Sequence, residues 1–382
     1  MPYHMAHALG EQGIDIVPIS STNTAKARRP VQQRLSNHYK RKTSDRFRRT
    51  LDTIGAPITR ALVRRAAKAQ SRTVQSNLLL LHESGQHLDA IFGCNISKAL
   101  VSLDTELPII YASDATGPMI IPNYPKLASR GSPFRETLIE TERTGVQRAN
   151  AAIFASPIAR ESAINDLGID QARTHVVPMG AHVTPDDPST ITAPASPPSR
   201  DNCQLLIVAA DPVRKRVDLA LKTTELLRAR AINTTLHIVG PGTQSSNASP
   251  VANPIGRLKL SDPNDRATHQ RHLHDCHLQL LPSLGEAFGI APIESAHFAR
   301  PSIVAGAGGL PFVVQHEKTG IVVNPESDAQ AWADAIESLI DEPDRYRAMS
   351  TAALQRARNE LNWDAWGRSV AQIITQTISA HR

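Results

Sequence analysis

The stretch LPSLGEAFGIAPIESAHFARPSIVAGAGGLP, from Leu281 to Pro311, says more about the fold than any other part of this 382-residue chain. It holds two carboxylates, Glu286 and Glu294, with seven residues between them. On one continuous helix this spacing would turn the second carboxylate about 80° from the first, at roughly 3.6 residues per turn. A better interpretation places Glu286 on a loop after a strand and Glu294 in the first turns of the following helix. Both acids then lie at the carboxyl end of a parallel strand, where open α/β sheets bind ligands and helix N-termini attract phosphate.

Strand-like apolar runs alternate with helical patterns through the rest of the chain, which is typical of βαβ units and parallel sheets. The predicted strands are 14–19, 88–93, 107–112, 152–155, 176–180, 205–208, 236–240, 277–281, 302–305 and 320–323. The predicted helices are 3–12, 217–230, 328–340, 344–360 and a last one from 363 onward. The pattern predicts an α/β protein with doubly wound parallel sheets.

The chain length suits two domains of about 150–190 residues each. Residues 183–201 are dense in Pro, Ser and Thr, and we expect them to form a linker. The predicted domains are therefore 1–182 and 202–363.

The composition is that of a soluble globular protein, with 41% hydrophobic and 20% charged residues. No apolar run approaches the roughly 20 residues that cross a bilayer, and the first twenty residues do not resemble a secretory signal. The three cysteines, Cys94, Cys203 and Cys276, are too few and too scattered for a disulfide framework. Because this usage fits a reducing compartment, we expect a cytoplasmic protein.

The net charge of +6 is concentrated near the start of the chain. Residues 26–49 hold ten Lys or Arg and one acid, and Arg60, Arg64, Arg65 and Lys68 extend the excess. One interpretation is a solvated helical face. The other is a patch for an anionic membrane surface or an acidic acceptor, that is, peripheral membrane contact through 26–68. We expect no nucleic-acid partner, because no recognised binding motif accompanies the charge.

The Glu286–Glu294 segment resembles the E-x7-E signature of retaining nucleotide-sugar glycosyltransferases of the family 4 type, the glycosyl transferases group 1, which have the GT-B fold. The resemblance implies two Rossmann-like domains facing a cleft, with a final helix, about 364–382, packing back on the first. It also implies that Glu294 holds the ribose hydroxyls of the donor nucleotide and that Glu286 faces the hydroxyls of the donor sugar. The alternative is that Glu294 only stabilises its own helix and that Glu286 is solvated.

Arg214 and Lys215 follow the predicted strand 205–208 by a short loop. They resemble the Arg-Lys-Gly element of the same family, whose two cations contact the donor phosphates. Such cations stabilise charge that develops on a leaving diphosphate, so no metal or other cofactor is expected. Arg216 stands where the family usually has Gly, and we expect a distorted entry into the next helix. Ala299 also replaces a common Gly.

By the same resemblance, further residues would line the donor site. They are Phe288, Gly289, Ile290, Gly240, Gly308, Gly309 and Ser156. Gly289 would let the backbone approach the diphosphate closely, because it lacks a Cβ. Asp114 stands where many relatives place a His beside the donor sugar, and an acid there would hydrogen-bond the sugar or the acceptor. Ser156 fits a strand-end cap equally well.

Two further features of the sequence limit the interpretation. Relatives of this type open with a strand and a Gly-rich loop, whereas residue 2 is already Pro and a helix follows. We therefore expect that the first domain lacks its first strand because the native start lies upstream. The group His269, His272, His274, Cys276 and His277 resembles a set of metal ligands, but it runs into a predicted buried strand, so we expect no metal site.

The sequence thus predicts transfer of a sugar from a nucleoside diphosphate to a hydroxyl acceptor, with retention of configuration. The acceptor would be a cell-envelope glycan, a lipid or a metabolite. A sugar-nucleotide epimerase on the same fold is an alternative, whereas a phosphorylase is disfavoured because the context of a pyridoxal lysine is missing. A non-catalytic binder of sugar nucleotides or anionic surfaces is the alternative from a different class.

Overall fold

The computed structural model describes residues 2–19, 56–241 and 248–382. They divide into two compact units, which are treated separately. The first unit comprises the described residues up to Val177 together with Trp366–Arg382, and the second comprises Pro178–Ala365. The basic stretch 26–49 lies outside the described residues.

The first unit is built on a four-stranded parallel sheet in the order β1-β2-β3-β4. Its strands are β1 (Ile91–Cys94), β2 (Ile109–Ser113), β3 (Ala151–Phe154) and β4 (Thr174–Val176). Its main helices are α1 (Pro2–Gly10), α4 (Ala56–Glu83), α5 (Ser97–Leu100), α6 (Gly117–Ile120), α7 (Pro125–Ala128), α8 (Ser132–Val146), α9 (Pro157–Asn165) and most of α17 (Trp363–His381).

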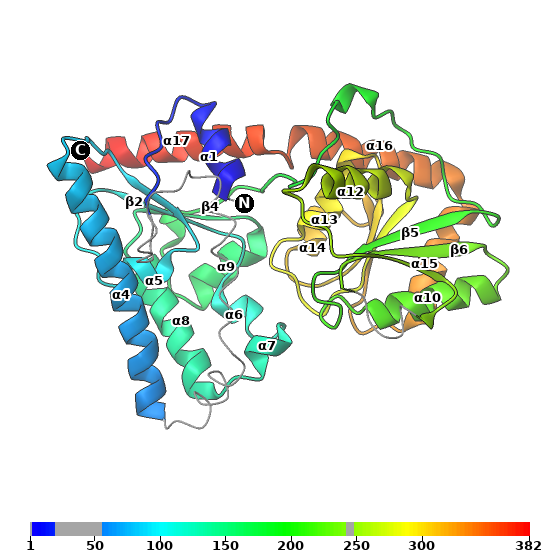
Figure 1. Cartoon of the computed structure of the whole chain (residues 1–382), viewed down its shortest axis with the longest axis horizontal. Coiled ribbons are helices and arrows are strands. Elements are labelled where there is room, and N and C mark those ends of the chain that lie inside the picture. Colours follow the sequence, from blue (N-terminus) through cyan, green and yellow to red (C-terminus); the bar gives the residue numbers. More distant parts are fainter. Residues whose placement is uncertain (1, 20–55, 242–247) are drawn as a thin grey trace. The chain divides into compact units, whose positions relative to one another are not determined.

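Side chains that alternate along the strands build a core on each face of this sheet. On one face, Tyr111 and Phe154 are buried together with apolar side chains of α4, α5, α8 and α9 (Figure 1). On the other face, the Phe92 ring meets the Trp366 ring of α17 edge-on, with 6.1 Å between the centroids. Helix α1 packs closely there, because a Cβ on Gly367 would lie 2.6 Å from the carbonyl oxygen of Ala8.

The second unit contains a six-stranded parallel sheet in the order β10-β9-β8-β5-β6-β7. Its strands are β5 (Cys203–Val208), β6 (Thr234–Val239), β7 (Ala252–Gly256), β8 (Leu278–Leu281), β9 (Ser302–Ala305) and β10 (Gly320–Val323). Its main helices are α10 (Val217–Ala229), α12 (Pro263–Asp275), α13 (Ile290–His297), α14 (Leu310–Val313), α15 (Ala329–Asp341) and α16 (Pro343–Asn359).

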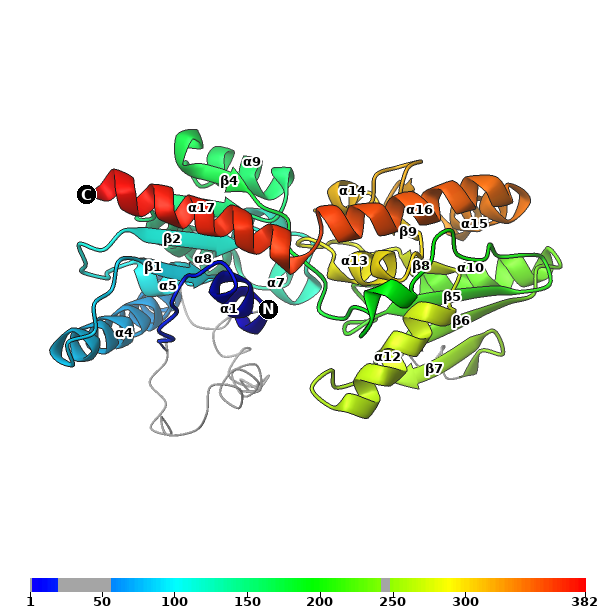
Figure 2. The same cartoon turned by 90° about the horizontal axis from the view of Figure 1, so that it is seen from above.

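Helices cover both faces of this second sheet. Helices α10 and α15 lie on one face and α12, α13 and α16 on the other, as Figures 1 and 2 show. Starting at β5, the chain adds β6 and β7 on one side and then β8, β9 and β10 on the other side. The direction of winding therefore reverses between β5 and β8. Such a switch point is where doubly wound sheets bind ligands, at the carboxyl ends of the strands.

Two of the strand predictions need correction. The predicted strand 14–19 is wrong: these residues form no strand, Ile19 is exposed, and Pro18 has no N–H to donate to a ladder. Strand β4 begins two residues before the predicted 176–180 and ends at Val176. Strand β7 was not predicted, because it is an edge strand with exposed residues and contains Pro254.

The Pro-rich segment 183–201 does more than connect the two halves of the chain. Val183, Ile191 and Ala195 are buried in the core of the second unit. The backbone N–H of Ala195 donates to the Ser350 hydroxyl at 2.8 Å, and that hydroxyl donates to the carbonyl of Ala299. The few apolar side chains of the segment 183–201 are enough to fix it on the second unit.

Candidate functional site

Two loops meet at the switch point of the second sheet. One follows β5 and carries Arg214 and Lys215, and the other follows β8 and carries Glu286. The backbone N–H of Leu284 donates to the carbonyl of Arg214 at 2.9 Å and ties the loops together. Because β5 and β8 are neighbours, residues far apart in the sequence come into contact here.

One oxygen of Glu286 is the centre of a buried ion cluster. Its Oε1 accepts hydrogen bonds from Nη1 of Arg214 at 2.8 Å, from the hydroxyl of Ser283 at 2.8 Å and from Nζ of Lys215. Nη1 of Arg214 also donates to the carbonyl of Gly285 at 2.7 Å. Glu286 and Lys215 are each only 8% exposed. The other oxygen of Glu286, Oε2, accepts no hydrogen bond from the described residues.

The cluster holds two cations against one oxygen of a carboxylate. Burial works to raise the pKa of Glu286, but the adjacent Lys215 and Arg214 outweigh it and hold that pKa below its ordinary value. Glu286 is therefore ionised and neutralises one of two cations. Burial lowers the pKa of Lys215, whereas the attraction of Glu286 works in the opposite direction. Both cations have several N–H donors, so they can also donate to an anionic group such as a phosphate while they hold Glu286.

Glu294 lies in the second turn of α13 and is 4% exposed. Its Oε2 lies 3.2 Å from Nε2 of His269, which is on α12. Its Oε1 accepts no hydrogen bond within the described part of the chain. Each carboxylate of the E-x7-E pair thus has one oxygen engaged by the protein and one oxygen left for a ligand. The negative charge of Glu294 also acts on Lys215, which brings the second carboxylate into the same electrostatic environment.

Local packing and backbone conformation explain why glycine occupies several positions beside this cluster. Gly289 precedes α13 with φ of +105°, a region that favours glycine, and a Cβ there would lie 2.6 Å from the side chain of Leu310. A Cβ on Gly309 would lie 2.8 Å from the carbonyl oxygen of Ala287. Gly240, after β6, has φ of +146° and lies against the carbonyl of Ala209. These glycines bring the turns at the carboxyl edge of the sheet close together.

Other predicted donor-site residues take structural positions at the same edge. Gly308 has φ of +56° in the turn after β9. The side chain of Phe288 is buried against Phe312, with 6.4 Å between the ring centroids. Ile290 begins α13. Phe288 therefore has only its backbone to offer to a ligand.

Arg216 occupies the position where the resemblance leads one to expect a glycine. Its backbone is left-handed, with φ of 51° and ψ of 50°, at the start of α10. Its guanidinium donates to the carbonyl of Pro325 at 2.6 Å. The helix entry thus keeps a conformation that suits glycine, and this hydrogen bond offsets part of the strain.

Asp114 and Ser156 belong to the first unit. Asp114 follows β2, next to Ser113, whose hydroxyl donates to the side-chain carbonyl of Asn95 at 2.6 Å. Ser156 is fully buried, and its hydroxyl accepts a hydrogen bond from the N–H of Ala159 at the start of α9. The structure therefore gives Ser156 a capping role, which was the second of its two interpretations.

The histidines that resembled metal ligands have other partners. Nδ1 of His277 accepts from the backbone N–H of Gln204 at 2.9 Å. The His272 ring lies 5.2 Å from the ring of His237, a strand residue. Neither contact needs a metal ion.

A half-buried acid, Glu142, was missed by the sequence reasoning. Glu142 on α8 accepts a hydrogen bond at 2.6 Å from the backbone N–H of Gly117, the first residue of α6. Burial raises the pKa of Glu142 to about 7, against the opposing effects of the Gly117 hydrogen bond and of Lys98. No sequence signal marks this residue, because it is one of several acids on an amphipathic helix and its burial is a tertiary effect.

This raised pKa predicts a pH-dependent stability. Between pH 4.5, where a free Glu titrates, and about 7, the folded protein holds a proton on Glu142 that the unfolded chain releases. Stability from this group is therefore present at low pH and is lost as the pH rises through 7. We expect the Glu142 contribution to fall by about 2 kcal/mol between pH 5.5 and 7.5.

The variant Glu142→Gln isolates this effect, because it keeps an acceptor for Gly117 but does not titrate. Urea denaturation at the two pH values should show a smaller pH dependence for the variant than for the original chain. Equal pH dependence in both would show that Glu142 is ionised in the folded state.

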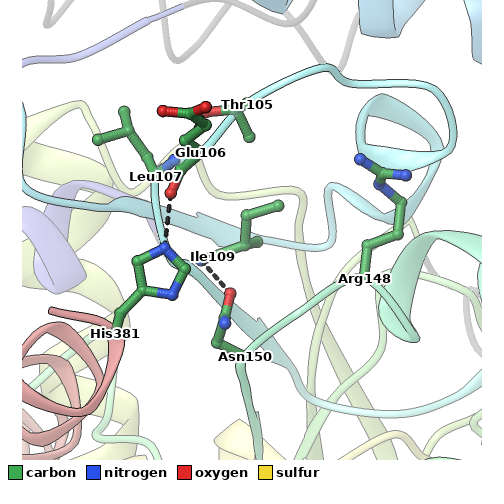
Figure 3. A pocket seen from close by; sticks show the side chains of 7 residues that line it. All are labelled: Thr105, Glu106, Leu107, Ile109, Arg148, Asn150 and His381. Atoms are coloured by element: carbon green, nitrogen blue, oxygen red, sulfur yellow. Dashed lines mark hydrogen bonds between the residues drawn. The ribbon is translucent and has the colours of Figure 1, made fainter.

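A pocket of about 470 Å³ opens on the first unit, away from the carboxyl ends of its strands (Figure 3). Its lining residues include Ile109, which begins β2, and Asn150, which precedes β3. Two of the polar side chains in Figure 3 are used within the protein: the Asn150 side chain accepts from the N–H of Ile109 at 2.9 Å, and Nε2 of His381 lies 2.6 Å from the carbonyl of Glu106. The pocket lies at the amino edge of the sheet, so it is not where a doubly wound unit binds its ligand.

Comparison with known proteins gives these features a family context. Residues 192–356 match the family model described as Glycosyl transferases group 1. The matched residues make up less than half of the 382-residue chain. Arg214, Lys215, Glu286 and Glu294 all lie within the matched residues.

Curated relatives cover the chain in part. D-inositol 3-phosphate glycosyltransferase of Kineococcus radiotolerans is 28% identical over 264 residues, which are 62% of this chain and 59% of the relative. Glycogen synthase of Mycobacterium tuberculosis is 29% identical over 179 residues, 46% of this chain and 43% of the relative. The chain thus spans less than two thirds of the length of these relatives.

Solved structures resemble the fold over a larger part. Sucrose-phosphate synthase of Thermosynechococcus elongatus matches with a TM-score of 0.62 and 19% identity, covering 83% of this chain and 79% of that one. HepE of Anabaena, solved with UDP, matches with a TM-score of 0.59 and 18% identity, covering 80% and 82%. These likenesses concern the fold alone. They confirm the predicted α/β architecture of the GT-B class with two parallel-sheet domains.

Proposed function

We propose that this chain is a retaining glycosyltransferase of the family 4 type, which moves a sugar from a nucleoside diphosphate to a hydroxyl group of an acceptor. The observation that carries the proposal is the arrangement at the switch point between β5 and β8. Two cations lie beside two buried carboxylates, and each carboxylate keeps one oxygen for a ligand. A nucleotide sugar offers the matching groups, a diphosphate with hydroxyls on both sides of it.

In the proposed reaction, the bond between the anomeric carbon and the diphosphate breaks, and negative charge develops on the leaving phosphate. Arg214 and Lys215 stabilise that charge, because they are fixed before the reaction by Glu286 and by the Gly285 carbonyl. Glu286 Oε2 would accept from a sugar hydroxyl and Glu294 Oε1 from the ribose. Retention would follow from attack on the same face that the diphosphate leaves, with the leaving phosphate taking the proton of the acceptor hydroxyl. The proposed reaction uses no metal ion and no cofactor.

The acceptor class is proposed as a cell-envelope glycan, a lipid or a metabolite, in the cytoplasm. The name of the Kineococcus relative points to a phosphorylated polyol as one acceptor to include in a test. The basic charge of this chain, +6 overall, is consistent with an anionic acceptor.

The experiment is a transfer assay with UDP-, GDP- and ADP-sugars as donors. Inositol phosphate and extracted cell-envelope material serve as acceptors, with a donor-only reaction alongside. We expect one donor to be consumed in the presence of an acceptor, with a product whose anomeric configuration by NMR is that of the donor. Donor conversion without an acceptor would indicate an epimerase or a hydrolase, and nucleotide binding without turnover would indicate a non-catalytic binder.

We also propose that α4 contacts an anionic membrane surface. Within the described residues no helix is both long enough and apolar enough to cross a bilayer. Helix α4, however, carries five Lys or Arg and only one acid, Glu83. Its buried side chains lie on one side, while Ile58, Leu62, Leu79 and Leu80 are exposed. Exposed apolar side chains among cations on one helix are typical of helices that lie on lipid headgroups.

Replacing Arg65, Lys68 and Arg72 together by Gln should weaken binding to vesicles that contain phosphatidylglycerol by at least about tenfold, since each cation near such a surface contributes about 1 kcal/mol. Co-sedimentation measures this binding, which should also weaken as salt is added. The matched control replaces the exposed Lys222, Lys259 and Lys318 of the second unit by Gln, with the same change in charge. An equal loss of vesicle binding in the control would show that binding depends only on the net charge of the protein and not on α4.

A further inference from the structure

His269 and Glu294 form a buried pair between two helices of the second unit. His269 is 2% exposed, and its Nε2 lies 3.2 Å from Oε2 of Glu294. Because an ionised carboxylate can only accept, Nε2 must carry the hydrogen of this bond. The other ring nitrogen, Nδ1, is buried and has no hydrogen-bond partner among the described residues. Its one hydrogen bond is therefore the polar contact that holds the ring in place.

The helix that carries His269 is itself fixed on both sides of this residue. Nη1 of Arg266 donates to the carbonyl of His182 at 3.3 Å. The side-chain amide of Gln270 donates to the carbonyl of Thr184 and to the carboxylate of Asp186, both at 2.8 Å. These contacts anchor α12 to the segment before β5. The imidazole is thus carried by a helix that is anchored on both sides of it. Such anchoring allows one side chain to orient another.

The pair has a consequence for the carboxylate. With Oε2 held by the imidazole, rotation of the Glu294 carboxylate is restricted, and Oε1 is the oxygen that remains to accept from a ligand. An unrestrained carboxylate would lose rotational freedom when it binds a pair of hydroxyls, and that loss would weaken binding.

We propose that His269 is a positioning residue, which orients Glu294 to accept from the vicinal hydroxyls of the donor ribose. The inference rests on the proposed function, because it assigns a ribose to Glu294. It goes beyond that function in naming a residue outside the E-x7-E motif that sets the affinity for the nucleotide and its preference for ribose over deoxyribose.

The test measures, by titration calorimetry, the dissociation constants of UDP, GDP and ADP, and then of the 2′-deoxy form of whichever binds best. The original chain should bind the ribose form more tightly. His269→Ala should weaken binding of the ribose form by about tenfold while changing that of the deoxy form little, so the preference should shrink. His269→Gln, whose amide N–H₂ can reach the position of Nε2, should restore most of the preference. His269→Asn, with a shorter side chain, should not.

The controls separate the possible outcomes. His274→Ala removes an exposed histidine from the same helix and should leave both constants unchanged.

If the original chain prefers ribose and both His269→Ala and His269→Asn keep the full preference, the role of His269 is wrong and the proposed donor site stands. If the original chain binds nucleotide with no preference for ribose, the assignment of Glu294 fails and the inference fails with it. If no nucleotide binds at all, the proposed function fails. Should His269→Ala unfold, the comparison of Gln with Asn carries the test.

Discussion

Replacing Glu286 by Ala should lower the free energy of unfolding of the second unit by about 3 kcal/mol, because it removes the buried carboxylate that pairs with both Arg214 and Lys215. In the intact cluster one carboxylate oxygen accepts from Arg214, Lys215 and Ser283. Without it, the two cations repel each other in a site that water hardly reaches. Urea denaturation of the purified chain measures the effect.

Two variants make the Glu286 prediction specific. Glu286→Gln keeps the volume and an acceptor oxygen but removes the charge, so it should destabilise less than Ala. Glu317→Ala breaks an ion pair with Arg345 in which the Glu317 side chain is 46% exposed, and it should cost at most about 1 kcal/mol. A loss for Glu286→Ala no larger than that for Glu317→Ala would mean that the cluster is solvated, and the cluster would then be no argument for a phosphate site.

Replacing Arg214 by Ala should slow sugar transfer at least tenfold, which corresponds to about 1.4 kcal/mol of lost transition-state stabilisation. The guanidinium is fixed by Gly285 and Glu286 before any ligand arrives, so it needs little reorganisation when charge develops on the phosphate. The measurement is steady-state kinetics with the best donor from the panel. The rate constant kcat should fall more than KM rises, because the charge is greatest in the transition state.

Arg214→Lys distinguishes the contribution of charge from that of geometry. Lysine keeps the positive charge but cannot form the forked contact, so the rate should recover in part. An unchanged kcat in Arg214→Ala, with the protein folded, would remove Arg214 from the reaction.

The strands and helices of the second unit follow closely from local sequence pattern. The apolar runs that form β5, β8, β9 and β10 are buried on both faces of the sheet. Such strands are recognisable in a sequence as continuous hydrophobic segments. The run 14–19 is also mostly apolar, but it pairs with no strand in the described residues, and hydrophobic periodicity alone does not identify a partner strand. Strand β7 was not predicted, because an exposed edge strand that contains Pro254 gives no apolar signal in the sequence.

Only the site residues that belong to a known family motif could be predicted from the sequence. Glu286 and Lys215 are 71 residues apart, and it was the resemblance to a family, rather than any local pattern, that suggested they act together. His269 lies 25 residues from Glu294, in a helix whose histidines first suggested a metal site. Its role depends on how α12 packs against α13, which no spacing in the sequence reveals. The same holds for Glu142, whose burial against Gly117 spans 25 residues.

The most direct test of the donor site is a crystal structure of the chain with the nucleoside diphosphate that it binds best. We expect phosphate oxygens within hydrogen-bond distance of Arg214 and Lys215, and the ribose hydroxyls on Oε1 of Glu294. A nucleotide bound elsewhere on the chain, with Glu294 and the Arg214–Lys215 pair untouched, would contradict the proposed site.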